Sequence, residues 1–188
     1  MLFRSSFSFV SPSSTPYAAN FPEVTLANQN ISDSGAVYAY FKASSTALEL
    51  LGTVYSDTSG EIISAYTNPQ TLYGFPSTLN TTVSDTYRRT GAYPQVGLTF
   101  VSIGTMNYLV DGYGTLINSS GTYNNVIRIK KREVGVDSTL SPFGDFASNT
   151  SSTSYEWVTT APSGSYGIWS ISYDTTTGGF NPDSYSLN

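Results

Sequence analysis

The chain has 188 residues, a formal net charge of −5 and a sequence pI of about 4.4. It contains no His and no Cys, which excludes Ser-His-Asp and Cys-His nucleophile systems, thiolate or imidazole metal sites, and disulfides. Lys and Arg together number only 8, so we do not expect nucleic acid as a partner. No apolar run approaches the roughly 18 residues of a membrane helix, so we expect no membrane insertion.

The composition favours β-structure. Aromatic residues make up 14% of the chain and charged residues only 11%, whereas disordered chains are poor in aromatics and carry high net charge. Tyr, Thr, Val and Ile fit a pleated, half-buried surface, and turn signals recur roughly every 8–12 residues, as in a β-sandwich. We therefore predict a single domain over residues 1–188: an all-β, antiparallel β-sandwich of two sheets with little or no helix.

The predicted elements begin with a strand over residues 5–10, in which Phe7 and Phe9 alternate with serines. Residues 11–35 predict an ordered crossing loop, so that residues 1–35 form an N-terminal strand and extended segment. Residues 44–51 fit either one or two helical turns or a strand after a bend. Alternating runs between turn signals predict strands over residues 38–43, 47–55, 61–66, 83–89, 96–110, 113–117, 123–136, 153–159, 166–173 and 185–187.

Glycines and turn residues punctuate the middle of the chain. Gly97 and Gly104 mark expected bulge or bend points in the long strand 96–110. Residues 118–121, with the sequence NSSG, predict a hairpin turn. The two sides of this hairpin read DGYGTLI over residues 111–117 and GTYNNVIRIK over residues 121–130.

Both hairpin segments, together with PQTL at residues 69–72 and the following Phe75-Pro76, resemble parts of secreted, β-rich Bacteroidota proteins that are exported by type IX secretion. The resemblance implies an extracellular or cell-surface location and a β-rich fold, and it supplies no catalytic residues. Such proteins usually carry an N-terminal signal peptide and a C-terminal sorting domain. We therefore expect this sequence to be either a processed mature form or a fragment.

Half of the basic residues lie together on the predicted strand 123–136. Ile127 and Ile129 give this strand an apolar side, Arg128 and Lys130 face the other way, and the alternation breaks at Lys131 and the following arginine. One interpretation is a solvated face whose charges prevent aggregation at a sheet edge. The alternative is a basic patch that binds a ligand.

Carboxylates are the main acid and base groups available, and none forms a recognisable motif. Asp57 and Glu61 flank a Ser-Gly turn, which they are expected to stabilise. Residues 141–145 and 174–179 each offer one carboxylate and a few hydroxyls, and no phosphate-binding Gly-rich loop occurs, so we predict no metal site and no cofactor. We predict no enzymatic activity; a carboxylate-dependent hydrolase is the third hypothesis. Its candidates are Asp57, Glu61, Asp111, Glu133, Asp137, Asp145, Glu156 and Asp174.

The distribution of Lys and Arg leads to the first functional hypothesis. None follows Arg132, and none lies between Lys42 and Arg88. Lysine on edge strands is a usual guard against strand-to-strand association, so its scarcity predicts either large self-contacts or a neutral surface that faces solvent.

The apolar side chains near the N-terminus, Phe7, Phe9 and Val10, fit such self-contacts. Their strand can complete a neighbour's sheet by β-strand addition, or it can pair within its own sheet. The first hypothesis is an extracellular, non-enzymatic structural protein that self-assembles head-to-tail into a filament or surface layer, with copies of itself as partner.

Aromatic side chains on the late strands lead to the second hypothesis, a secreted glycan-binding or adhesion module with polysaccharide as partner. Tyr155, Trp157, Tyr166 and Trp169 lie on the strand pair 153–159 and 166–173, and strand alternation places Tyr155 and Trp157 on one face. The alternative is that both tryptophans belong to the core and the tyrosine rims are half-buried.

Overall fold

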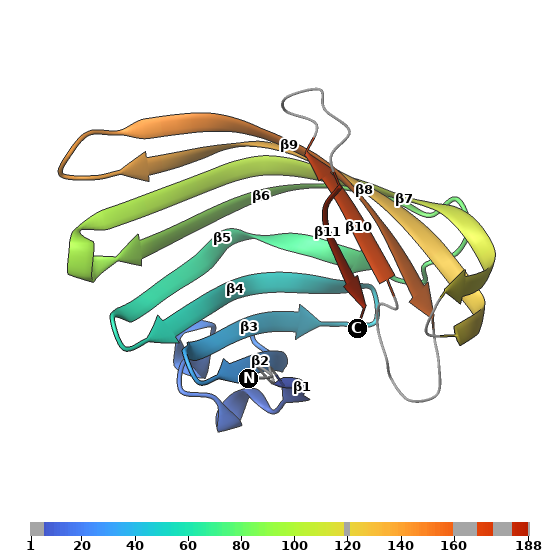
Figure 1. The fold of residues 1–188 in the computed structure, drawn as a ribbon, viewed down its shortest axis with the longest axis horizontal. Helices are drawn as coiled ribbons and strands as arrows, with labels where there is room; N and C mark the ends of the chain where they lie inside the picture. Colours follow the sequence, from blue (N-terminus) through green and yellow to red (C-terminus); the bar gives the residue numbers. More distant parts are fainter. Residues whose placement is uncertain (1–5, 119–120, 160–168, 175–181, 188) are drawn as a thin grey trace. The chain divides into compact units, whose positions relative to one another are not determined.

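The computed structural model describes residues 6–118, 121–159, 169–174 and 182–187. The strands belong to one sheet, in which their order follows the sequence from β1 to β11 (Figure 1). The neighbouring strands whose residue-by-residue pairing is known are all antiparallel. The elements are β1 (Ser6–Val10), η1 (Pro12–Ser14), η2 (Ala18–Asn20), β2 (Leu26–Ser32), β3 (Gly35–Ala43), β4 (Ala47–Asp57), β5 (Gly60–Gly74), β6 (Thr82–Tyr93), η3 (Pro94–Val96), β7 (Leu98–Asn118), β8 (Gly121–Leu140), β9 (Phe146–Thr159), β10 (Trp169–Asp174) and β11 (Pro182–Leu187).

The predicted all-β class is confirmed, but the predicted two-sheet sandwich is wrong. Within the described ranges, the helices are three 3-10 turns of three residues each. The strands form one sheet in which each is hydrogen-bonded to its sequence neighbours. Alternation predicts that a strand has one covered face, but it does not say whether a second sheet or a loop covers it. The sandwich prediction assumed a second sheet.

Several strands differ in length from those predicted. β7 has 21 residues and unites the predicted strands 96–110 and 113–117, and β8 has 20 residues, whereas strands usually have about 3–10. Residues 47–51 are a strand, which settles that part of the ambiguous segment 44–51. Gly97 bends the chain before β7, at a left-handed φ of 67°. The predicted hairpin turn falls partly on residues 119–120, outside the described residues.

The chain divides into two compact units. Unit 1 consists of residues 1–75, 86–104 and 136–148, and unit 2 of residues 76–85, 105–135 and 149–188. The long strands β6 to β9 each contribute residues to both.

The core of unit 1 lies between its strands and the segment that follows β1. Phe21, which comes directly after η2, is 2% exposed and stacks on Tyr40 of β3 with ring centroids 4.4 Å apart. Tyr17 packs edge-on against Tyr38, with centroids 5.5 Å apart. The Tyr40 hydroxyl donates a hydrogen bond of 3.0 Å to Thr15 Oγ1. The first part of the segment predicted as an ordered crossing loop over residues 11–35 therefore covers one face of the sheet, whereas residues 26–32 of that segment form β2, so the loop prediction is wrong there.

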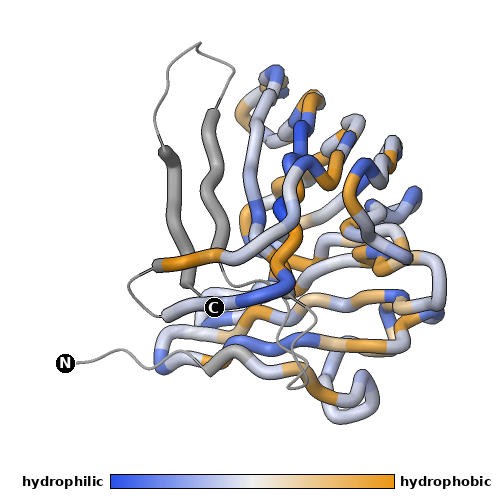
Figure 2. The backbone as a smooth tube through the Cα atoms, turned by 90° about the vertical axis from the view of Figure 1, so that its right-hand side faces the viewer, coloured by the Kyte–Doolittle hydropathy of each residue, from blue (hydrophilic) through white to orange (hydrophobic). Residues whose placement is uncertain are grey.

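Hydrophobic and hydrophilic residues are interspersed along the chain trace (Figure 2), and in unit 2 buried residues alternate with exposed ones along β7. Met106, Tyr108 and Val110 on β7 are at most 2% exposed, and Ile129 on β8 is fully buried. The opposite side chains of β7 are exposed, including Leu109. One face of these two strands is therefore packed and the other is accessible.

Candidate functional site

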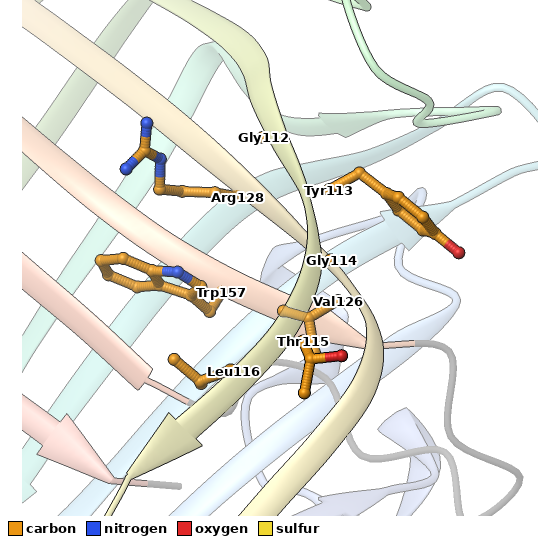
Figure 3. Close-up of a pocket in the computed structure, with 8 residues that line it drawn as sticks. All are labelled: Gly112, Tyr113, Gly114, Thr115, Leu116, Val126, Arg128 and Trp157. Carbon is orange, nitrogen blue, oxygen red and sulfur yellow. The ribbon is translucent and has the colours of Figure 1, made fainter.

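The candidate site is an open hollow of about 290 Å³ in unit 2, formed by β7, β8 and β9. Gly112 and Gly114 of β7 lie at its base, Arg128 projects from β8, and Trp157 projects from β9. Figure 3 shows Arg128, Trp157 and Leu116 on one side of the β7 ribbon. Other lining residues are Tyr113, Thr115 and Val126.

Neither glycine carries a side chain, and the space above the β7 backbone is open at Gly114. Nothing lies within 4 Å of a Cβ added at Gly114, so open space stands above it. A Cβ added at Gly112 would come within 3.3 Å of Arg128 Cβ. Because glycine has no side chain, a ligand can approach the backbone closely between the arginine and the tryptophan.

Arg128 is fixed by an ion pair with Asp111. Arg128 Nε donates to Asp111 Oδ1 at 2.8 Å, and a terminal guanidinium nitrogen donates to Oδ2 at 3.2 Å. This two-point contact raises the pKa of Arg128 and fixes the plane of the guanidinium. Arg128 therefore contributes an oriented hydrogen-bonding edge rather than a net charge.

Tyr155 connects this hollow to further cations on β8. The Arg128 guanidinium carbon lies 5.5 Å from the centroid of the Tyr155 ring, and Lys130 Nζ lies 5.9 Å from the same centroid. Both distances allow cation–π attraction, which extends to about 6 Å. The aromatic ring therefore lies beside two consecutive outward side chains of β8.

The break in alternation at Lys131 has a structural explanation. Lys131 Nζ forms an ion pair with Glu156 Oε2 at 2.9 Å, and the two side chains are only 15% and 22% exposed. The half-buried cation is thus neutralised by a carboxylate of the neighbouring strand β9. Lys131 therefore lies on the same side of β8 as Ile129, as alternation predicts, and an ion pair occupies a position where an apolar side chain was expected.

A second hollow, of about 320 Å³, lies along the same strand in unit 2. Lys130 and Arg132 of β8 line it together with Asn107 and Leu109 of β7 and residues 82–84 of β6. Both cations are exposed at the surface. In the part of the chain that the structure describes, neither Lys130 nor Arg132 has a carboxylate within ion-pair distance.

Structural contacts involve Asp57, Glu61, Asp111 and Glu156 among the hydrolase candidates. Asp57 accepts hydrogen bonds from Tyr55 (2.8 Å) and from two backbone N–H groups of the following turn (2.7 and 3.2 Å). These bonds, that of Tyr55 first, lower the pKa of Asp57, and they confirm its predicted turn-stabilising role. Glu61 accepts a hydrogen bond from a tyrosine hydroxyl of the N-terminal segment. The remaining two, Asp111 and Glu156, form the ion pairs with arginine and lysine.

The described residues contain neither a metal-ligand cluster nor a membrane-spanning helix. Among them, no group of three or more Asp, Glu, His or Cys side chains is arranged to hold a metal ion. The same residues include no helix of the length and apolarity needed to cross a membrane.

The structure brings together part of the predicted aromatic platform. Tyr155 and Trp157 lie on β9, and Trp157 is half-buried and lines the first hollow. Trp169 lies opposite Trp157 in the β9–β10 register, but its side chain is outside the described residues. Tyr166 is outside them altogether.

The predicted self-assembly residues lie on β1, which pairs with β2 of the same chain. Phe9 is 47% exposed, and its ring centroid lies 6.5 Å from that of Phe41. Val10 packs against the core of unit 1. Phe7 lies in the same strand, and its side chain is outside the described residues.

Sequence reasoning missed the glycine base of the first hollow and the second hollow entirely. Gly112, Arg128 and Trp157 are far apart in the sequence, and only the pairing of β7, β8 and β9 brings them together. The sequence signals for this region were the basic run on β8, interpreted either as an edge guard or as a ligand-binding patch, and the aromatic pair Tyr155 and Trp157 on β9.

Comparison with protein-family models, curated proteins and solved structures finds no match for this chain.

Proposed function

We propose that this chain is a non-enzymatic, extracellular glycan-binding module. The observation that carries the proposal is the first hollow, in which Trp157 and Arg128 lie beside the β7 backbone at Gly112 and at Gly114, above which the space is open. Trp offers a large, rigid apolar face with one polar atom, which suits the apolar face and polar rim of a sugar ring. The volume of about 290 Å³ is at the lower end of small-molecule sites, about 300–1,000 Å³.

The polar groups around the hollow support a carbohydrate ligand. Arg128 is oriented by Asp111, so its remaining donors point in fixed directions. The hydroxyl groups of Tyr113 and Thr115 donate hydrogen bonds to the side chains of Asn125 and Asn124, so the hydrogen-bond donors that the hollow offers a ligand come from Arg128. An extracellular location is supported by the sparsely charged, Thr- and Tyr-rich composition and by the resemblance to secreted Bacteroidota proteins.

Isothermal titration calorimetry against soluble oligosaccharides cut from dextran, xylan, mixed-linkage glucan and polygalacturonate tests the proposal. At least one should bind, and Trp157→Ala should weaken its binding roughly tenfold or more, about 1.4 kcal/mol. Phe75→Ala is the matched control, because it removes an aromatic side chain of 39% exposure from unit 1. Lack of binding to every glycan, or equal losses for the two variants, would refute the proposal.

A second candidate function is self-assembly into a filament or surface layer, and an apolar tip in unit 1 favours it. The tip comprises Phe143, Phe146, Leu140 and Val96, which are 96%, 67%, 43% and 46% exposed. A Cβ added at Gly97, beside Val96, would lie 3.2 Å from the Pro142 side chain, so the two segments are adjacent. Exposed apolar patches of this kind often mark association surfaces.

The mode of assembly also involves the sheet edges. β1 and β11 are the end strands of the order, so head-to-tail association would join such edges by strand addition. Because β1 already pairs with β2, β1 would act as a template edge and not as a donated strand. Electron microscopy and sedimentation velocity test this candidate. Phe143→Ser should reduce assembly through the tip, and deletion of residues 1–10 should abolish edge addition; strictly monomeric wild-type protein at high concentration would exclude both routes.

A further inference from the structure

We propose that the glycan bound by unit 2 is an acidic polysaccharide, and that the second hollow holds its anionic groups. This inference rests on the proposed glycan-binding function and specifies its substrate class. Lys130 and Arg132 are the residues that would contact carboxylate or sulfate groups of the ligand.

The first argument is the charge state of the second hollow. The basic residues Lys42, Arg128 and Lys131 each have a carboxylate partner at 2.8 to 2.9 Å. Lys130 and Arg132 have none within the described ranges, although the chain as a whole carries a net charge of −5. Two uncompensated cations in one hollow give a local positive potential that attracts anions.

The second argument is the position of these cations in the sheet. β8 lies between β7 and β9 in the strand order, so Lys130 and Arg132 do not protect a sheet edge. The interpretation of the basic run as an edge guard is therefore wrong, because the guard mechanism acts only at unpaired strands. The ligand-binding interpretation needs no sheet edge and is compatible with this topology.

The third argument is continuity with the first hollow. Arg128 lines the first hollow and Lys130 lines the second, and both stand within 6 Å of the Tyr155 ring centroid. Residues i and i+2 of a strand project on the same face, about 6.6–6.8 Å apart along the strand. A polymer whose sugar ring stacks on Trp157 can thus extend along β8, past Tyr155, and place its next anionic groups beside Lys130 and Arg132.

The test uses the full chain and two matched pairs of polymer fragments. The first pair is oligogalacturonate and its methyl ester, which share a backbone and differ in carboxylate charge. The second pair is dextran sulfate and dextran, which differ in sulfate. We expect calorimetry to show that the acidic member of at least one pair binds about tenfold more tightly than its neutral counterpart. This difference in affinity should shrink with added salt, because the screening length falls from about 10 Å at 0.1 M to about 3 Å at 1 M. The pair that shows the preference identifies the anionic group.

The variant K130Q/R132Q should bring the affinity for the acidic ligand close to that for its neutral counterpart. R88Q is the matched control, since Arg88 is an exposed cation of unit 1 that lines neither hollow, and it should change affinity less than twofold. Should K130Q/R132Q melt early, K130R/R132K keeps both charges and should retain the acidic preference.

Two results would overturn the inference. Equal affinity for the acidic and neutral members of both pairs would show that charge is not recognised. An unchanged acidic preference in K130Q/R132Q would place recognition elsewhere. In either case, binding that still depends on Trp157 would leave the glycan-binding function intact. Absence of binding to all four ligands would refute this inference, and it would refute the glycan-binding function as well only if xylan and mixed-linkage glucan also failed to bind.

Discussion

The packing of Phe21 predicts that the segment between β1 and β2 is required for the stability of unit 1. Phe21 is 2% exposed and stacks on Tyr40 at 4.4 Å. A buried aromatic side chain removes about 150–250 Å² from water, worth roughly 4–6 kcal/mol at about 25 cal/mol per Å². Alanine retains part of that area, so Phe21→Ala should lower the free energy of unfolding by about 3–5 kcal/mol.

Urea unfolding followed by tyrosine and tryptophan fluorescence, and in parallel by circular dichroism, measures this loss. Asn20→Ala is the control one position earlier, because Asn20 is exposed and should change the free energy of unfolding by less than about 0.5 kcal/mol. If Phe21→Ala costs less than about 1 kcal/mol, the segment does not close the core, and the account of how the sheet face is covered fails.

Three further predictions concern a half-buried ion pair, a buried phenol and a close contact. Lys131→Met leaves the 22%-exposed side chain of Glu156 without its cation and should cost about 1–3 kcal/mol in urea unfolding, whereas Lys131→Met with Glu156→Leu should recover most of it. Burial raises the pKa of Tyr40, so the stability that its neutral form contributes is present below pH 10 and lost as the pH rises above it; Tyr40→Phe should make stability less sensitive to pH above 10. Gly91→Ala would place a Cβ 2.0 Å from the Phe100 ring and should cost about 1–3 kcal/mol, less when Phe100 is also replaced by Leu.

The fold class could be predicted from the sequence because aromatic and β-branched residues alternate between turn signals over most of the chain. Sheet number could not, since alternation reports that a face is covered and not by what. The covering residue Phe21 lies in a stretch without periodicity, between the turn residues of η2 and Pro22. No pattern in that stretch indicates that its aromatic side chain reaches β3.

The site was predictable only where it lies on one strand. Strand alternation alone predicts that Tyr155 and Trp157 share a face, and both residues lie on β9. Gly112 and Arg128 join them through the order β7-β8-β9, which depends on strand pairing along the whole sheet. The sequence also does not distinguish a glycine that opens a hollow from a glycine that bends a strand. Gly104 was predicted as a bend or bulge point. It lies within β7, where an added Cβ would come 2.6 Å from the Tyr87 hydroxyl oxygen, so the close approach of Tyr87 requires glycine there.

The distribution of charge over the sheet connects the two proposed functions. Soluble sheets usually carry cations on their edge strands, where unpaired backbone groups invite association. Here the end strands, β1 and β11, contain no Lys or Arg, whereas β8, between two neighbours, contains four. Charge on an interior strand cannot repel a neighbouring sheet edge, but it can hold an anionic ligand.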